Sequence, residues 1–147
     1  DPIKRARNRA WTDFVPDFAK GLSGIYYTKT QAEMDAGIEA APAKLAKLEE
    51  AIGAERGNDG PYFNGDALCL VDAAYAPFFQ RFLLVDAKLD TGVLDGFPRV
   101  KAWVDALMAS ETVTGSVPEN FETEFKANLR RRGFLAGDLL DVADAAD

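Results

Sequence analysis

Apolar residues recur along this chain with the spacing of α-helices, and no segment alternates in the manner of a β-strand. The first helical stretch starts at Asp1-Pro2, an N-cap residue followed by proline at the first helical position. Pro16 predicts a kink within this stretch, because proline removes a helical hydrogen bond. Its apolar stripe contains Ala10, Phe14, Phe18 and Leu22.

The next segment has the most regular apolar seam of the chain, with steps of four and three residues, and predicts a long helix. Its apolar positions are Met34, Ile38, Ala41, Leu45, Leu48 and Ile52. Pro42 lies within the seam and predicts a bend. Residues 53–65 contain Gly57, Gly60-Pro61 and Asn64-Gly65, which indicate a loop.

Residues 67–85 are apolar on nearly all sides, which is typical of a helix in the middle of a bundle. A further helix is expected after Phe97-Pro98, and another from near Pro118 to Gly133. The acidic tail, residues 135–147, forms either a short amphipathic turn or a disordered segment. The pattern predicts an all-α bundle of about five helices.

Composition narrows the range of functions. The 147 residues suit one domain, and a net charge of −7 argues against nucleic acid or an anionic membrane as partner. We find neither a signal peptide nor an apolar run of membrane-spanning length, so we expect a cytoplasmic protein. The chain starts at Asp1 rather than at methionine, and we therefore expect a longer parent protein.

The absence of histidine removes Ser–His and Cys–His catalysis and histidine-ligated metals. The only cysteine, Cys69, leaves no intrachain disulfide and no CxxC pattern. The glycine-rich stretches match neither a phosphate-binding loop nor a dinucleotide fingerprint. Composition therefore leaves the chain with little catalytic equipment, and we predict no metal ligand and no bound cofactor within it.

Two motifs carry a resemblance to a known family. In residues 60–74 (GPYFNGDALCLVDAA), Cys69 and Asp72 have the spacing of a capping box at the start of a buried helix. This motif resembles the start of the sixth helix of soluble glutathione transferases, although the family usually has serine or threonine where this chain has Cys69. Sulfur is a weak acceptor, so Asp72 is expected to contribute more to the cap.

The second motif, residues 97–108 (FPRVKAWVDALM) followed by Thr112-Val113, resembles the next helix of the same family. Together the motifs extend the resemblance over residues 1–134, as the C-terminal helical domain of a glutathione transferase. Pro77 to Arg81 resembles omega-like and bacterial members.

The resemblance implies a two-domain parent. A thioredoxin-like domain, which this chain does not contain, would bind glutathione and supply a serine, cysteine or tyrosine that acts on its thiol. The helical domain would form one wall of the pocket for a hydrophobic, electrophilic small molecule and part of a homodimer face. The reaction is then conjugation of the glutathione thiol or thiol exchange, and the fragment alone is expected to be inactive.

The resemblance also suggests substrate-binding residues. Arg81 matches an arginine that lines the pocket in omega-like members, and Phe121 and Phe125 lie where the last helix presents aromatic rings. Trp11 and Phe14 lie on the helix that flanks the cleft. A pocket predicts that Trp11, Arg81, Phe121 and Phe125 converge on one partly exposed cleft. The alternative is a surface arginine and aromatic rings that pack within the bundle.

Other chemically capable residues have simpler interpretations. We expect Cys69 to be a small, inert, buried thiol, since no cation is adjacent in sequence. Four cations lie close together at the start of the chain: Lys4, Arg5, Arg7 and Arg9. We expect them to form a solvated first turn rather than an anion site. One group of carboxylates is expected on an exposed face: Glu49, Glu50 and Glu55.

Two other functions remain open at this point. Helical domains of this kind also occur as non-catalytic interaction modules in translation factors, tRNA synthetases and bacterial stress proteins, and the fold alone does not distinguish these. Such a module predicts a flat apolar patch on an outer helix face. A third hypothesis is an autonomous helical protein.

Overall fold

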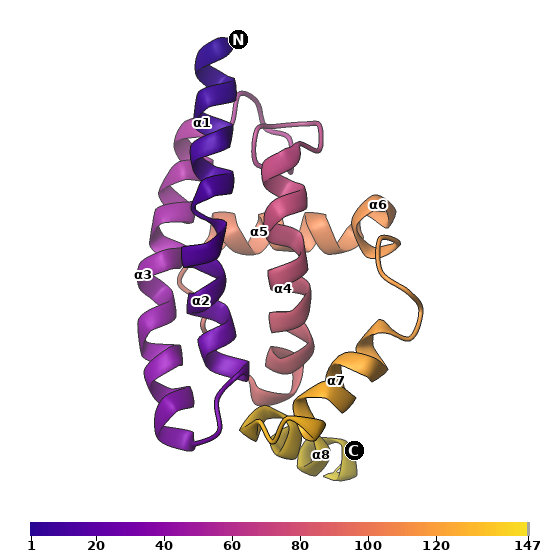
Figure 1. Cartoon of the computed structure of the whole chain (residues 1–147). Coiled ribbons are helices and arrows are strands. Elements are labelled where there is room, and N and C mark those ends of the chain that lie inside the picture. The colour runs from indigo at the N-terminus through magenta and orange to yellow at the C-terminus, as the bar shows by residue number, and fades with distance from the viewer. Residues whose placement is uncertain (147) are drawn as a thin grey trace.

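The computed structural model describes residues 1–146, and within them the chain is all-α, as predicted. Its eight helices are α1 (Pro2–Asp13), α2 (Val15–Tyr26), α3 (Gln31–Glu55), α4 (Leu70–Leu89), α5 (Pro98–Ala109), α6 (Glu111–Thr114), α7 (Phe121–Arg131) and α8 (Leu135–Ala146) (Figure 1). No helix in the described part of the chain has both the length and the hydropathy needed to cross a membrane.

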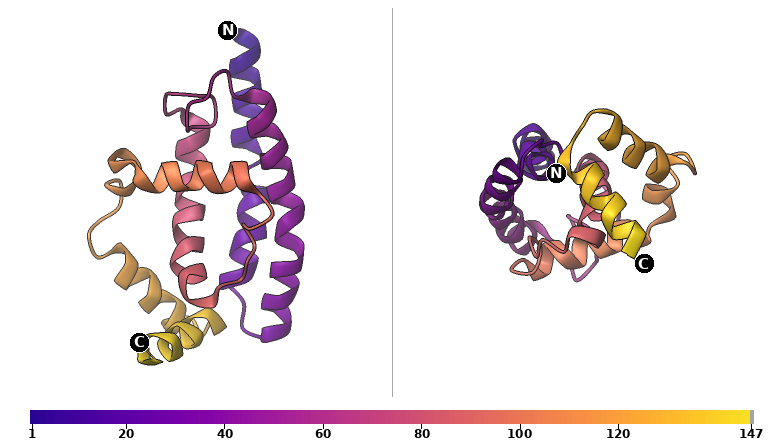
Figure 2. Two further views of the ribbon diagram at one scale, coloured as in Figure 1. Left: turned by 180° about the vertical axis from the view of Figure 1, so that it is seen from behind. Right: turned by 90° about the horizontal axis from the view of Figure 1, so that it is seen from below.

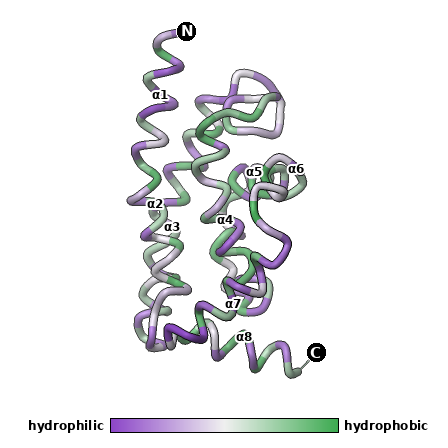
Figure 3. Tube along the Cα trace, turned by 45° about the vertical axis from the view of Figure 1, so that its right-hand side comes forward, coloured by the Kyte–Doolittle hydropathy of each residue, from purple (hydrophilic) through white to green (hydrophobic). Residues whose placement is uncertain are grey.

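The helix α4 is central to the bundle. It packs against α1, α2, α5 and α8, while α5 crosses the long helices and α7 and α8 lie at the lower end (Figures 1 and 2). The central position of α4 confirms the prediction that was made from the apolar side chains on nearly all sides of residues 67–85. Around α1, α2 and α3, by contrast, hydrophilic and hydrophobic positions alternate, as expected for helices with one apolar face (Figure 3).

The kink predicted at Pro16 is a break between two helices. Helix α1 ends at Asp13 and α2 starts at Val15, with Phe14 in helical conformation between them. At its other end α1 is capped as expected, since the Asp1 carboxylate accepts a 2.8 Å hydrogen bond from the Ile3 N–H.

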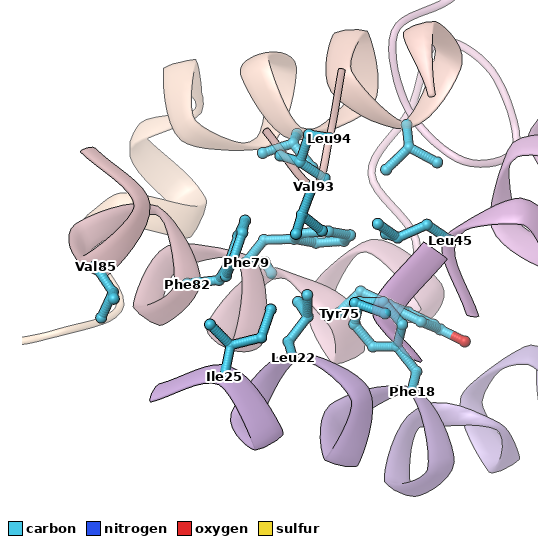
Figure 4. Packing of buried hydrophobic residues seen from close by; sticks show 14 of the residues in the cluster. Phe18, Leu22, Ile25, Leu45, Tyr75, Phe79, Phe82, Val85, Val93 and Leu94 are labelled. Carbon is cyan, nitrogen blue, oxygen red and sulfur yellow. The ribbon is translucent and has the colours of Figure 1, made fainter. Parts of the chain in front are cut away.

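Most of the largest fully buried side chains are aromatic, and Figure 4 shows Phe18, Tyr75, Phe79 and Phe82 among the aliphatic residues of the core. The ring centroid of Phe18 lies 4.9 Å from that of Tyr75 and 5.1 Å from that of Phe79. The Trp103 indole lies 5.6 Å from the rings of Tyr75 and Phe79. Tilted and edge-to-face contacts at these distances add favourable quadrupole interactions to the burial of apolar surface.

The start of α4 is held by one fully buried carboxylate. Asp72 accepts hydrogen bonds from the Cys69 N–H at 2.8 Å, the Phe63 N–H at 2.9 Å and the Trp103 Nε1–H at 2.7 Å. The first of these is the carboxylate half of the capping box that the spacing predicts. The other two connect α4 to the preceding loop and to α5.

The expectation of an exposed acidic face is wrong for Glu49. Helix α5 begins at Pro98 without a capping side chain of its own. Glu49 of α3 supplies one, because its carboxylate oxygens accept from the Arg99 and Val100 N–H groups at 3.0 and 2.9 Å. Glu55 is also largely buried and pairs with Arg7 at 3.4 Å. Only the tertiary packing of α3 on α5 and α1 creates these partners.

The acidic tail differs from both alternatives, because residues 135–146 form a helix of 12 residues rather than a short turn or a disordered segment. Residues 135–146 form α8, which packs on α7 and α4 and buries Ala136 and Leu140. A β-carbon on Gly137 would come within 2.8 Å of the Arg130 nitrogen, so glycine permits the close approach of α8 to α7. Residue 147 lies outside the described residues.

We predict that replacing Asp72 by alanine lowers the free energy of unfolding by at least about 3 kcal/mol, because two buried N–H donors and one partly buried donor each lose an acceptor. Trp103→Phe removes one donor and keeps most of the apolar volume, so its loss should be smaller. Urea unfolding followed by circular dichroism measures both. Asp105→Ala, at an exposed position of α5, is the control and should change stability by less than about 0.5 kcal/mol. Equal effects of Asp72→Ala and Asp105→Ala would contradict the role of the buried carboxylate.

Candidate functional site

A groove runs along one side of α4. Its upper part is a cavity of about 300 Å³ between the start of α4 and the α6 region, and its lower part is one of about 480 Å³. The two parts share Gln80 and Val117, and Phe121 lines the lower one. The lining residues come from α4 on one side and from α6 and the segment that leads into α7 on the other. Figure 1 shows where these elements lie in the fold.

The upper part is mainly apolar and contains few polar groups. Leu68, Ala76 and Val113 line it. Pro77 has no N–H, so the carbonyl of Ala73 beside the same cavity lacks its usual helical donor. The Gln80 amide adds donors and an acceptor. A few polar groups in an apolar cavity are typical of small-molecule sites.

Arg81 lies beside the lower part and contacts Phe121. Its guanidinium carbon is 5.1 Å from the centre of the Phe121 ring, a cation–π geometry, and its Nη1 donates to the Pro77 carbonyl at 2.8 Å. The Phe121 ring stacks on Phe125 with centroids 6.1 Å apart, and Phe125 meets Tyr26 at 5.8 Å. The structure therefore brings Arg81, Phe121 and Phe125 together.

Tyr26 supports this cluster from α2. Burial raises the pKa of the Tyr26 hydroxyl far above its ordinary value, while the Arg81 charge acts in the opposite direction. The phenol is therefore protonated throughout the physiological range, and it contributes an apolar ring rather than an anion to the cluster.

Trp11 and Phe14 lie elsewhere, so the expected single cleft for all the aromatic candidates does not form. The Trp11 ring packs edge-on against Phe14 at 5.9 Å, and its carbonyl accepts from the Tyr75 hydroxyl at 2.7 Å. Trp11 lines a different hollow, of about 320 Å³, together with Lys47 of α3. Phe14 lies 5.2 Å from the Lys47 ammonium.

Several groove residues were missed by sequence reasoning: Leu68, Gln80, Leu84, Ser116 and Val117. Ser116 and Val117 lie in a loop outside both motifs, and Leu84 is an ordinary apolar position of α4. Leu68 and Gln80 lie within stretches that carry the resemblance, but nothing in the pattern marks them as lining residues. One sequence feature could have indicated the hollow. Ala73, Ala76 and Pro77 place small side chains on one side of an otherwise bulky helix.

Cys69 borders the upper part of the groove but lacks the environment of a reactive thiol. Its sulfur accepts a hydrogen bond from the Asn64 amide at 3.2 Å. Burial raises the pKa of the Cys69 thiol, and the neighbouring Asp72 carboxylate adds to the increase. The thiol is therefore protonated at neutral pH, and the thiolate is the nucleophilic form.

Comparison with known proteins is consistent with this architecture. Residues 31–106 match the family described as glutathione S-transferase, C-terminal domain, and this match covers more than half of the chain. The chain therefore belongs to the glutathione S-transferase C-terminal domain family.

The similar proteins are longer than this chain. It is 29% identical over 133 residues to glutathione S-transferase U19 of Arabidopsis thaliana, with 90% of this chain and 58% of the relative covered. The probable glutathione S-transferase parC of Nicotiana tabacum is 29% identical over 137 residues, with the same coverage. Glutathione S-transferase L2, chloroplastic, of Arabidopsis thaliana is 30% identical over 99 residues, which cover 65% of this chain and 33% of the relative. The chain thus spans less than two thirds of the length of these relatives.

We predict that Cys69 reacts with iodoacetamide more slowly than free cysteine at neutral pH. Because its pKa is raised, the rate should increase only at a higher pH than for free cysteine. Mass spectrometry of the intact chain follows the reaction, and Cys69→Ser, which leaves no thiol, measures the background. A rate above that of free cysteine at neutral pH would contradict an inert thiol.

Proposed function

We propose that residues 1–134 are the helical, co-substrate-binding domain of a glutathione transferase, followed by the acidic segment 135–147, of which residues 135–146 form α8 against α7 and α4. The groove along α4 would hold a hydrophobic electrophile while glutathione is bound mainly by a thioredoxin-like domain of the parent protein. The observation that carries the proposal is the groove along α4. Its upper part is mainly apolar, and its lower part is lined by Phe121, whose ring contacts Arg81 and stacks on Phe125. The names of the similar proteins support the same class of reaction.

In the proposed reaction the glutathione thiolate attacks an electrophilic carbon or sulfur of the bound molecule. A bond forms from the thiolate sulfur, and the leaving group departs with its electron pair. The present chain would contribute orientation and exclusion of water rather than proton transfer. On its own the chain is expected to be inactive.

Arg81 would orient an anionic or carbonyl-bearing substrate at the groove. One guanidinium nitrogen donates to the Pro77 carbonyl, and contact with Phe121 restricts the plane of the group. The remaining N–H donors suit a carboxylate or a carbonyl oxygen.

Trp11 and Phe14 are assigned to a different surface under this proposal. They lie where α1 and α2 meet α3, with Lys47 over the Phe14 ring. We propose that this side contributes to a homodimer of the parent protein, which acts in the cytoplasm. Sedimentation of the parent and of its Trp11→Ala variant tests the assignment, which a monomeric parent would overturn.

The first experiment is to translate the coding region immediately upstream of Asp1, roughly 80 residues for a thioredoxin-like domain. A thioredoxin-like segment with a serine, cysteine or tyrosine near its first helix would support the proposal and identify the nucleophile. An unrelated segment or a stop codon would favour a helical interaction module instead.

For the whole protein we predict that Phe121→Ala raises the KM for a nitroaromatic electrophile about tenfold, equivalent to about 1.4 kcal/mol of lost binding. The KM for glutathione should stay unchanged, because the groove does not hold that substrate. Phe14→Ala removes the same ring on another surface and is the matched control. If Phe14→Ala raises the electrophile KM and Phe121→Ala does not, the co-substrate lies at the α1–α3 side and the groove assignment fails.

A further inference from the structure

One main-chain carbonyl group lies open at the upper part of the groove along α4. Pro77 stands inside α4 and has no N–H, so the carbonyl of Ala73, one turn earlier, lacks the donor that the helix would otherwise supply. Both residues are exposed, and both line the cavity of about 300 Å³. The Arg81 guanidinium, one turn beyond Pro77, donates to the Pro77 carbonyl instead. The Ala73 carbonyl can therefore accept a hydrogen bond from a molecule in the groove.

The polar side chains around this carbonyl add more acceptor sites than donors. The Ser116 hydroxyl donates its hydrogen to the Val113 carbonyl at 2.6 Å, so its oxygen keeps only acceptor sites. Thr112 and Gln80 can each donate or accept. Among the described residues that line this part of the groove, none carries a charge, because the raised pKa keeps the Cys69 thiol protonated.

A molecule that fills the upper part displaces water from the Ala73 carbonyl. A molecule without a donor leaves this acceptor without a hydrogen bond, which lowers its affinity. A hydroxyl or N–H group on an apolar body restores the bond. An ammonium group would also donate, but it would lose its hydration without meeting an opposite charge in the described lining. The upper part therefore favours neutral donors.

We propose that the upper part of the groove selects hydrophobic molecules that carry a neutral hydroxyl or N–H group. The Ala73 carbonyl is the acceptor, and Pro77 determines the specificity because it keeps this carbonyl free of a helical partner. The inference rests on the proposed function and narrows it, since it names the class of co-substrate that the groove prefers. The two ends of the groove then differ in chemistry, because Arg81 beside the lower part offers donors.

Titration of the 147-residue chain with indole and with benzofuran tests the proposal. The two molecules have nearly the same size and shape, but only indole has an N–H group. Amide chemical shifts should place both at Ala76, Gln80 and Val113, and indole should bind at least about threefold more tightly than benzofuran. Benzylammonium, a charged donor, should bind at least about threefold more weakly than indole at physiological salt.

Pro77→Ala is the decisive variant, because an alanine N–H at this position would donate to the Ala73 carbonyl within the helix. The ratio of indole affinity to benzofuran affinity should then fall to about one. The ratio is measured rather than either affinity, since loss of the proline ring removes the same apolar contact from both molecules. Alanine forms helices better than proline, so the variant should fold, which circular dichroism verifies.

The matched control is Pro42→Ala, which makes the same exchange inside α3. Pro42 lines neither part of the groove, so the affinity ratio should stay as in the unaltered chain. A structural effect of losing any helical proline would change the ratio in both variants, whereas a free acceptor in the groove changes it only in Pro77→Ala.

Each of four results would overturn the proposal: equal affinities for indole and benzofuran, benzylammonium binding as tightly as indole, a ratio that persists in Pro77→Ala, or a ratio that falls equally in both proline variants. Failure of the proposed function is measured separately, by the upstream sequence and by the electrophile KM of the parent protein. That failure would remove the co-substrate role and leave the preference for indole, and its dependence on Pro77, unaffected.

Discussion

The fold depends on one buried carboxylate. A charge removed from water is costly unless hydrogen bonds replace its hydration, and Asp72 accepts three, from Cys69, Phe63 and the indole of Trp103. These donors belong to the start of α4, the preceding loop and α5. Because α4 contacts four other helices, the position of its first turn determines where the rest of the bundle packs. The capping box therefore acts as a tertiary connection as much as a helix cap.

The groove follows from how α4 and α5 are fixed. Glu49 caps α5 from α3, and Trp103 joins α5 to Asp72, so α5 crosses the bundle in one orientation. The chain then turns through α6 and passes the side of α4 where Ala73, Ala76 and Pro77 leave space. Small side chains opposite a bridging segment produce a hollow, and the Arg81–Phe121 contact borders its lower part.

Positive charge is concentrated at the start of α1. The chain as a whole has a net charge of −7, yet α1 carries four cations between Lys4 and Arg9. Arg7 is paired with Glu55, whereas Arg5 and Arg9 face a cavity beside an exposed leucine. Since acidic residues outnumber basic ones over the whole chain, this local positive surface does not make the molecule bind polyanions.

Much of this protein could be predicted from its residues alone. Helical periodicity identified the main helices, the apolar surface of residues 67–85 placed α4 in the centre, and the capping-box and tryptophan motifs indicated the family. These features are local in sequence, so they can be identified from the sequence alone.

The sites depended on contacts between distant segments. Glu49 is a cap only because α3 meets α5. The acidic tail is helical because α7 and α4 offer it an apolar surface. Trp11 is separated from Phe121 because α1 and α7 lie on different sides of the bundle. Side-chain periodicity reports which positions are buried, but it contains no information on which helices meet, and tertiary packing alone decided that.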